Sequence, residues 1–346
     1  MKIVIDLCHP AHINFFKNAL SILKLDYGVD CELTILPRPS VVSIIQKEYE
    51  GMPFSSIGKY KSSLVGKALC LIKRTKMLIK YLRATNFDLV TSVGSYGIAQ
   101  AAYFLRKPSV IFYDDIEYKL LVESFKPFAT RIVFPSQCPI MGKKIVKYSG
   151  FKELSYLHPN YFIPNEEVLV EYGIEPSKYV FLREVSSSSL NYSNLIQGQL
   201  ANVCHYLRDM GLEVVLSLEN KALKNRFEGQ CTILKEPVSD IHSLLHFASL
   251  TISSGDSMAR ESCLVGTPSI YTGGRIMSIN KELEDKSCLF RVEADKTDQI
   301  LEKIRYIIEN NVKKKTEKII KEAIKTEWED TTRVIIDNVL DFVQRV

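Results

Sequence analysis

The stretch "SSGDSMARESCLVGTPSIY" (residues 253–271) joins the end of one apolar run to the start of the next. The first run is "SLTIS" (249–253) and the second is "PSIYT" (268–272), and both are typical of short buried strands. Between them the pattern predicts a helix that begins near Asp256 or Ser257 and stops at the Gly-Thr-Pro that follows it. A strand, a helix and a second strand in this order form the repeating unit of a parallel α/β sheet.

The same alternation continues along the whole chain. Helical periodicity is clearest at 13–24, 40–49 and 64–83. Short apolar runs predict strands at 2–7, 31–36, 87–93, 108–113 and 130–134 in the first half, and at 178–184, 212–218, 231–234, 249–253 and 268–272 in the second. The sequence therefore predicts an α/β protein with two doubly wound, Rossmann-like domains that face each other across a cleft.

The boundary between these domains is predicted in residues 147–167, which follow neither period and are punctuated by glycine and proline. This gives an N-terminal domain over 1–155 and a C-terminal domain over 156–325. The tail, 311–346, is predicted to be one long helix. We expect its last part, 326–346, to return to the N-terminal domain.

The composition of the chain is that of an ordinary globular protein. Its 346 residues are 46% hydrophobic and 25% charged, and the net charge of +5 is mild. No apolar run is long enough to span a membrane, and we expect no signal segment. The eight cysteines lack metal-ligand spacing, which predicts free thiols in a reducing cytoplasm. No aromatic-basic stripe or DNA-reading motif is present, so we expect no nucleic-acid partner.

Small or ionisable residues follow most of the predicted strands. In parallel sheets, ligands bind outside the carboxyl ends of the strands. The segments at these positions are Cys8 to His12, Gly94 to Gly97, Asp114 to Glu117, Ser186 to Ser189, Glu219-Asn220 and Ser254 to Ser257. So many polar strand ends are difficult to explain as ordinary turns, and we expect them to line the predicted cleft.

The turn formed by Ser254, Gly255, Asp256 and Ser257 is the strongest local signal for a ligand site. Small residues at the start of a helix let backbone N–H groups approach a diphosphate. Glu261 follows one helical turn later, where a carboxylate suits ribose hydroxyls. The alternative is that a serine or aspartate only caps the helix and that Glu261 faces solvent.

Two histidines, His9 and His12, follow the first predicted strand. His12 lies at the start of the helix predicted over 13–24, where a neutral imidazole suits a general base near neutral pH. His9 is either a hydrogen-bond partner of a substrate or a cap of that helix. His242 and His246 lie one helical turn apart, and without an acid or cysteine at ligand spacing they predict a half-buried helix face rather than a metal site.

Asp114, Asp115 and Glu117 follow the strand predicted over 108–113, and carboxylates of this kind bind hard cations. Helix N-termini hold phosphate without a cation, so we favour a site with neither metal nor cofactor. Arg183, with the serines that follow shortly after it, forms either a phosphate-facing loop or a plain linker.

Residues 59–83 combine basic and apolar side chains at helical spacing. The basic ones are Lys67, Lys73, Arg74, Lys76, Lys80 and Arg83, and the apolar ones include Leu64, Leu71, Ile72 and Leu78. Such a segment is either a surface helix packed on its sheet or a helix that lies on anionic lipid. The second alternative predicts weak, salt-sensitive peripheral binding to anionic membrane.

Five segments make the chain similar to a family of uncharacterised proteins of the GT-B glycosyltransferase superfamily, whose genes often lie in surface-polysaccharide clusters. The segments are "HPAHINFFKN" (9–18), "GSYGIAQAA" (94–102), "FYDDIEY" (112–118), "YSGFKELSYLHPNYF" (148–162) and "GDSMARESCLVGTPSIY" (255–271). That family resembles MurG and the non-hydrolysing UDP-N-acetylglucosamine 2-epimerases. The resemblance covers nearly the whole chain and implies the GT-B fold.

The resemblance also implies a role for each group of residues. The C-terminal domain would bind a nucleotide-sugar through Arg183, Glu219, Ser254, Gly255, Asp256, Ser257 and Glu261. The N-terminal domain would bind the acceptor near His9, Gly94, Ser95 and Asp114. His12 would stand where MurG-like inverting enzymes carry a histidine. Asp114, Asp115 and Glu117 would lie at a strand end where epimerase relatives keep acidic catalytic residues.

The chain departs from these relatives at two places. The turn 253–255 has serines where relatives are often richer in glycine. The loop 185–192 lacks the histidine and the aspartate expected there. Each departure implies either an altered choice of donor or a weakened site.

Three functions are consistent with these residues. Our main hypothesis is a cytoplasmic glycosyltransferase that moves a sugar from a UDP-sugar to a hydroxyl of a glycan or lipid-linked acceptor in surface-glycan synthesis. It would invert the anomeric carbon without a metal, with His12 as the base. The second is a nucleotide-sugar 2-epimerase. The third is a non-catalytic nucleotide-sugar-binding or scaffold protein of a glycan-assembly complex.

Overall fold

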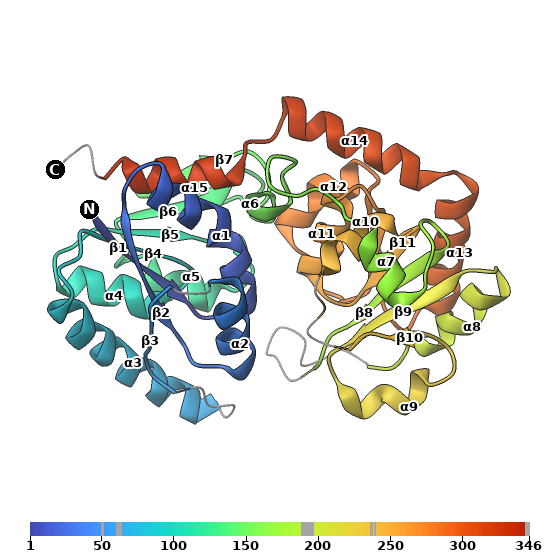
Figure 1. Cartoon of the computed structure of the whole chain (residues 1–346), viewed down its shortest axis with the longest axis horizontal. Helices are drawn as coiled ribbons and strands as arrows, with labels where there is room; N and C mark the ends of the chain where they lie inside the picture. The colour runs from blue at the N-terminus through green and yellow to red at the C-terminus, as the bar shows by residue number, and fades with distance from the viewer. Residues whose placement is uncertain (50–51, 60–63, 188–196, 236–237, 239, 343–346) are drawn as a thin grey trace. The chain divides into compact units, whose positions relative to one another are not determined.

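The structure is a computed structural model that describes residues 1–49, 52–59, 64–187, 197–235, 238 and 240–342. The chain divides into two compact units (Figure 1). Unit 1 is Met1–Tyr161 together with the segment that begins at Trp328, and unit 2 is Phe162–Glu327. None of the helices in the described part of the chain is long and apolar enough to cross a membrane.

The described residues of unit 1 form a seven-stranded parallel sheet in the order β3-β2-β1-β4-β5-β6-β7. The strands are β1 (Lys2–Leu7), β2 (Asp30–Ile35), β3 (Phe54–Ser56), β4 (Leu89–Val93), β5 (Ser109–Phe112), β6 (Arg131–Pro135) and β7 (Ile145–Tyr148). Helices cover both faces, which is the doubly wound arrangement that the sequence predicts. One face carries α1 (Pro10–Leu25), α2 (Pro39–Glu48) and α15 (Thr331–Leu340). The other carries α3 (Leu64–Ala84), α4 (Tyr96–Phe104) and α5 (Lys119–Phe125), and the short α6 (Leu154–Leu157) packs against α1.

Unit 2 repeats this plan with a six-stranded parallel sheet among its described residues, in the order β10-β9-β8-β11-β12-β13. The strands are β8 (Tyr179–Glu184), β9 (Glu213–Leu218), β10 (Thr232–Ile233), β11 (Leu250–Ser253), β12 (Ser269–Tyr271) and β13 (Leu289–Arg291). The helices are α7 (Glu167–Tyr172), α8 (Ala201–Asp209), α9 (Lys224–Phe227), α10 (Ile241–Phe247), α11 (Asp256–Leu264), α12 (Lys281–Asp285), α13 (Thr297–Glu309) and α14 (Val312–Thr326), with 3-10 turns η2 (Lys221–Leu223) and η3 (Ser278–Asn280).

Three predicted features of the secondary structure were wrong or missing. The tail is two helices, because α14 ends at Thr326 and the Asp330 side chain accepts hydrogen bonds from the backbone at the start of α15. The helix predicted from residue 13 begins at Pro10, since the His9 side chain caps it. Strands β3, β7 and β13 were not predicted, because strands of three or four residues are too short to show a strand period.

Strand β1 shows why its sheet is buried on both faces. Ile3, Ile5 and Leu7 alternate into the core shared with α1 and α15. Val4 points into the opposite core with α3 and α4, and the alternation places Asp6 on that same face. Asp6 is completely buried, so its carboxylate needs partners inside the protein.

The partners of Asp6 come from three other elements. Arg74 of α3 donates two hydrogen bonds to the carboxylate, at 3.0 Å and 2.6 Å. Thr34 of β2 donates at 2.8 Å, and Ser95, which precedes α4, donates at 2.5 Å. Burial alone would raise the pKa of Asp6, but the Arg74 charge and these hydrogen bonds hold it below its usual value. The ionised carboxylate therefore joins two strands and two helices.

This pair corrects one part of the membrane hypothesis. Arg74 is buried, not lipid-facing, and Leu78 packs in the core. Ile72 is exposed, as are Lys73 and Lys76. The side chains of Lys67, Leu64 and Leu71 lie outside the described part of the chain.

Replacing Asp6 by asparagine is expected to destabilise unit 1 by about 3–5 kcal/mol, because Arg74 would stay buried without its counter-charge. Trp328 reports on this unit, since it is the single tryptophan, is buried and lies 5.0 Å from the Phe151 ring. Its fluorescence during urea unfolding measures the loss. As a control, Glu123→Gln breaks an exposed pair with Lys126 in the same unit and should leave the midpoint unchanged. Equal midpoints for Asp6→Asn and the parent would contradict the assignment.

Candidate functional site

Each sheet has one position where the order of its strands reverses direction. In unit 1 it lies between β1 and β4, and in unit 2 between β8 and β11. In doubly wound proteins the loops leave two such neighbouring strands in opposite directions, and ligands bind in the crevice that this opens at the carboxyl ends. Most of the residues singled out in the sequence follow one of these four strands.

In unit 1, the turn between β1 and α1 holds both histidines. The Nδ1 atom of His9 accepts a hydrogen bond from the Ala11 amide at 3.3 Å and caps α1. The Nδ1 atom of His12 accepts one from the Cys8 amide, also at 3.3 Å. Because Nδ1 is the acceptor, the neutral His12 ring carries its proton on Nε2.

The His12 ring is held in its neutral form. Its pKa lies well below the usual 6.5, first because burial penalises the imidazolium and then because the charges of His9 and Lys152 oppose it. The neighbouring Cys8 thiol lies 3.4 Å from the Asp6 carboxylate, and burial raises its pKa to about 12. At neutral pH this turn therefore offers a neutral imidazole and an unreactive thiol.

The turn between β4 and α4 lies beside the turn between β1 and α1. Gly94 has φ +60°, and a Cβ atom there would stand 2.7 Å from the Tyr113 ring, so only glycine fits. Ser95 hydrogen-bonds to Asp6, and its hydroxyl lies 3.8 Å from the Cys8 sulfur. Asp6 thus ties the β4–α4 turn to the β1–α1 turn.

The acidic residues after β5 have different surroundings. Asp114 is buried and forms an ion pair with Lys152, with its two oxygens 2.8 Å and 3.0 Å from the ammonium. Asp115 accepts a hydrogen bond from the Tyr118 amide at 3.2 Å, and Glu117 is half-buried. Sequence reasoning missed Lys152, although it lies in the distinctive segment 148–162. Among the described residues, no three His, Cys, Asp or Glu side chains are grouped so as to hold a metal ion.

In unit 2, Arg183 at the end of β8 is held by β9. It donates to the Ser217 hydroxyl at 2.6 Å and to Glu219 at 3.1 Å. The other Glu219 oxygen accepts from the Ser186 amide at 2.6 Å, so Glu219 fixes the start of the loop after β8. Residues 188–196 of that loop, including Ser188 and Ser189, lie outside the described residues.

The turn between β11 and α11 packs tightly against the same loop. The Val185 amide donates to the Ser254 hydroxyl at 2.9 Å, and the Ser254 amide donates to the Arg183 carbonyl at 3.0 Å. A Cβ atom on Gly255 would lie 2.8 Å from a Val185 methyl group. The turn therefore requires a glycine at the N-cap of α11, where first-turn amides point out of the helix.

Two charged side chains support this helix start. Arg260, which the sequence did not single out, is fully buried and lies 2.9 Å from the Asn280 side chain and 3.4 Å from Asp256. Glu261 is only 9% exposed, which contradicts the alternative that it faces solvent. Its carboxylate lies 3.8 Å from His242. His242 and His246 are half-buried on α10, as predicted.

Solved structures with this fold include nucleotide-sugar enzymes. A UDP-N-acetylglucosamine 2-epimerase from Rickettsia bellii matches with a TM-score of 0.74 and 14% identity, covering 100% of this chain and 97% of that one. The epimerase of Methanocaldococcus jannaschii, in complex with UDP-GlcNAc and UDP, matches at 0.69 and 14%, covering 99% and 100%. The glycosyltransferase VinC, in complex with DTDP, matches at 0.67 and 13%, covering 100% of both chains. The chain therefore has the GT-B fold.

The sequence comparisons agree over the full length. A family model described as a protein of unknown function, DUF354, matches residues 1–344. An uncharacterised protein of Methanocaldococcus jannaschii is 20% identical over 356 residues, covering 99% of each chain.

The depressed pKa of His12 predicts an acid-sensitive contribution to stability. Between pH 6.5 and the lower pKa of the folded state, the His12 ring is protonated in the unfolded chain but neutral in the folded chain. The free energy of unfolding should therefore fall as the pH is lowered through 6.5 towards the folded pKa. The free energy of unfolding of the His12→Gln variant should fall less steeply between pH ~7 and ~5, as measured by urea unfolding at each pH. His158 and His246 also have lowered pKa values, so some loss of stability at low pH should remain in the variant. If the free energy of unfolding of the parent and of the variant fell in parallel with pH, the assignment to His12 would be contradicted.

Proposed function

The chain belongs to the DUF354 family, whose model matches residues 1–344. We propose that it is a GT-B glycosyltransferase, which transfers a sugar from a UDP-sugar to a hydroxyl acceptor in surface-glycan synthesis. The observation that carries the proposal is the β11–α11 turn. It lies where the strand order reverses, has no room for a side chain at Gly255, and presents the first-turn amides of a nine-residue helix. An anion is the ligand that such a helix start favours.

The donor diphosphate would bind at this turn. The α11 dipole and the amides that follow Gly255 would stabilise its charge, and would do so further as UDP leaves. Glu261 lies one turn further along, next to His242, and its carboxylate would accept hydrogen bonds from the ribose hydroxyls. Arg183 is already engaged by Ser217 and Glu219, so its role would be to hold the neighbouring loop rather than to neutralise phosphate alone. The chemistry needs no metal, because the helix supplies the positive end of its dipole.

His12 would act as the base in the acceptor site. Its ring is neutral at pH 7, so it has a lone pair to accept the hydroxyl proton while the oxygen attacks the anomeric carbon with inversion. In the resting tautomer this lone pair is on Nδ1, bound to the Cys8 amide. Moving the proton to Nδ1 breaks that long hydrogen bond and leaves the Cys8 amide without its acceptor, which costs about 1–3 kcal/mol. A general base supplies a rate factor of about 10²–10⁴, which corresponds to about 3–5 kcal/mol and offsets this cost.

A second candidate is a nucleotide-sugar 2-epimerase, and one observation favours it. Asp114, Asp115 and Glu117 lie together after β5, with Asp114 buried against Lys152. Such carboxylates suit proton transfer at a sugar carbon. Epimerisation needs no acceptor, so incorporation of deuterium at C2 of a UDP-sugar in heavy water, with no acceptor present, would favour this candidate over the transferase.

Activity of two His12 variants tests its role. Release of UDP from UDP-sugars with extracted acceptor measures turnover. Both His12→Ala and His12→Gln should lose about 10²–10⁴-fold in kcat, because glutamine keeps a hydrogen-bond donor but takes no proton. Near-parental turnover by His12→Gln alone would show that the ring acts as a donor. Near-parental turnover by both would remove it from catalysis.

The close packing of Gly255 gives a separate test of the donor site. Gly255→Ala should weaken UDP affinity by about tenfold or more, because the new methyl group collides with Val185 and displaces the turn. Calorimetric titration with UDP measures this. The backbone at Gly255 has φ −98°, so alanine brings no strain of its own. Val185→Ala in the same chain should restore binding, and Val185→Ala alone is the control. An unchanged affinity for Gly255→Ala would place the nucleotide elsewhere.

A further inference from the structure

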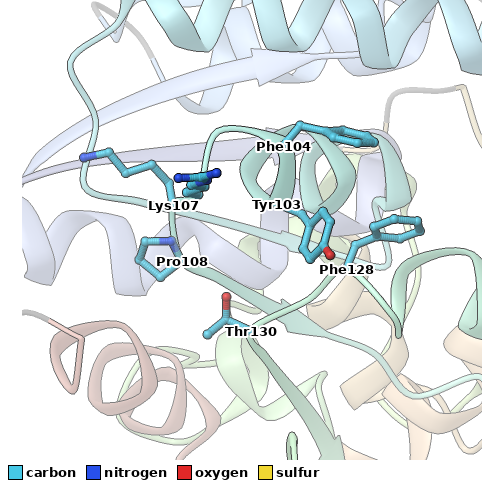
Figure 2. Close-up of a pocket in the computed structure, with 7 residues that line it drawn as sticks. Tyr103, Phe104, Lys107, Pro108, Phe128 and Thr130 are labelled. Atoms are coloured by element: carbon cyan, nitrogen blue, oxygen red, sulfur yellow. The ribbon is translucent and has the colours of Figure 1, made fainter.

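Unit 1 exposes an aromatic cluster at the end of α4. Tyr103 and Phe104 are its last two residues, and Phe128 follows α5. The ring of Tyr103 lies 5.9 Å from that of Phe104 and 5.4 Å from that of Phe128. Tyr103 is 54% exposed and Phe104 is 61% exposed. Figure 2 shows the three side chains together at the groove. Large apolar groups grouped on a surface mark an interaction site more often than scattered ones do.

The groove beside this cluster is separate from the candidate site in unit 1. It has a volume of ≈ 600 Å³, and its lining includes Pro108 and Thr130. These residues precede β5 and β6, so the groove lies at the amino ends of the parallel strands. His12 and Asp114 follow β1 and β5, at the carboxyl ends. The cluster therefore has no part in the chemistry proposed for those residues.

Two basic residues, Arg106 and Lys107, line the same groove. Arg106 has φ +55°, a left-handed conformation that usually takes glycine after a helix and costs energy with any other side chain. Arg106 is exposed, and it lines the same groove as the three rings. Neither Arg106 nor Lys107 forms an ion pair with any residue that the structure describes. A strained, unneutralised cation beside exposed rings points to an anionic partner.

The neighbouring helix extends this basic surface. α3 packs against α4, and both helices end at the amino edge of the sheet (Figure 1). No acidic residue occurs between Glu50 and Asp88. The exposed basic residues of α3 include Lys73, Lys76, Lys80 and Arg83. Ile72 and Met77 lie among them and are 61% and 48% exposed.

We propose that the aromatic cluster, with Arg106, Lys107 and the exposed face of α3, docks unit 1 on an anionic lipid bilayer. Amphipathic rings and cations together suit the headgroup region, where rings insert and cations meet lipid phosphates. A soluble polyanion would satisfy the charges but would leave the rings, Ile72 and Met77 in water. A single acidic peptide would contact only part of this surface and would leave the basic face of α3 unused. A lipid surface uses both features.

Binding of the full chain to vesicles tests this directly and requires no nucleotide, so it is independent of the proposed transferase activity. The parent should co-sediment with mixed phosphatidylglycerol–phosphatidylcholine vesicles at low salt, but not with phosphatidylcholine alone. Arg106→Gly with Lys107→Gln should weaken binding about twenty-fivefold, at about fivefold per charge. Glycine is the residue that the φ of Arg106 favours, so this variant should fold. Tyr103→Ser with Phe104→Ser should weaken binding about tenfold.

Unit 2 offers a matched control. Tyr306 is 43% exposed, and the Lys303 ammonium lies 4.9 Å from its ring. Lys303→Gln with Tyr306→Ser removes one charge and one exposed ring, and it should leave vesicle binding unchanged. Three results would overturn the proposal: a parent that does not sediment, an aromatic variant that binds as the parent does, or a control variant that loses binding equally. Binding to heparin through these residues, without vesicle binding, would assign the surface to a soluble polyanion.

The depth of insertion gives an independent readout. Tyr103→Trp adds a second tryptophan to a chain whose Trp328 is buried. Its emission should shift to shorter wavelength with anionic vesicles and be quenched by brominated lipid. An unshifted, unquenched emission on vesicle-bound protein would show that the rings stay in water and would overturn the docking mode.

Discussion

The Asp6 carboxylate is the interaction on which the arrangement of unit 1 depends. It is completely buried, and it joins β1, β2, α3 and the β4–α4 turn through hydrogen bonds from Thr34, Arg74 and Ser95. A buried charge with a full set of partners adds little net stability, but its loss is costly because the partners remain. The Asp6 carboxylate therefore acts mainly by positioning Cys8 and Ser95, which follow β1 and β4 at the point where the strand order reverses.

In unit 2, different interactions hold the turns that follow the central strands. At the corresponding crevice, Arg183 is held by Ser217 and Glu219, and the Ser254 hydroxyl accepts from the Val185 amide. Gly255 then brings the α11 turn against Val185. Unit 1 thus offers a neutral imidazole at its crevice, and unit 2 offers a helix start that favours an anion. A transferase needs both a base and a stabilised leaving group, and this complementarity supports the proposed function.

The sequence predicts the core of each sheet well, because buried parallel strands are nearly continuous apolar runs. The sequence does not predict ion pairs between residues that are far apart in the chain. Asp6 sits in the middle of such a run, and its partner Arg74 is 68 residues away on a helix that suggested a lipid-facing charge. Lys152 pairs with Asp114 across 38 residues. The strand ends and the α11 turn were visible because their signals are local.

The proposed function requires that the amides at the start of α11 bind a nucleotide diphosphate. Hydrogen–deuterium exchange of the full chain, with and without saturating UDP, tests it most directly. UDP should slow exchange in peptides that cover Gly255–Ala259 and Arg183–Ser187, and leave those that cover α4 unchanged. Unchanged exchange at both segments in the presence of bound UDP, or protection confined to unit 1, would contradict the account.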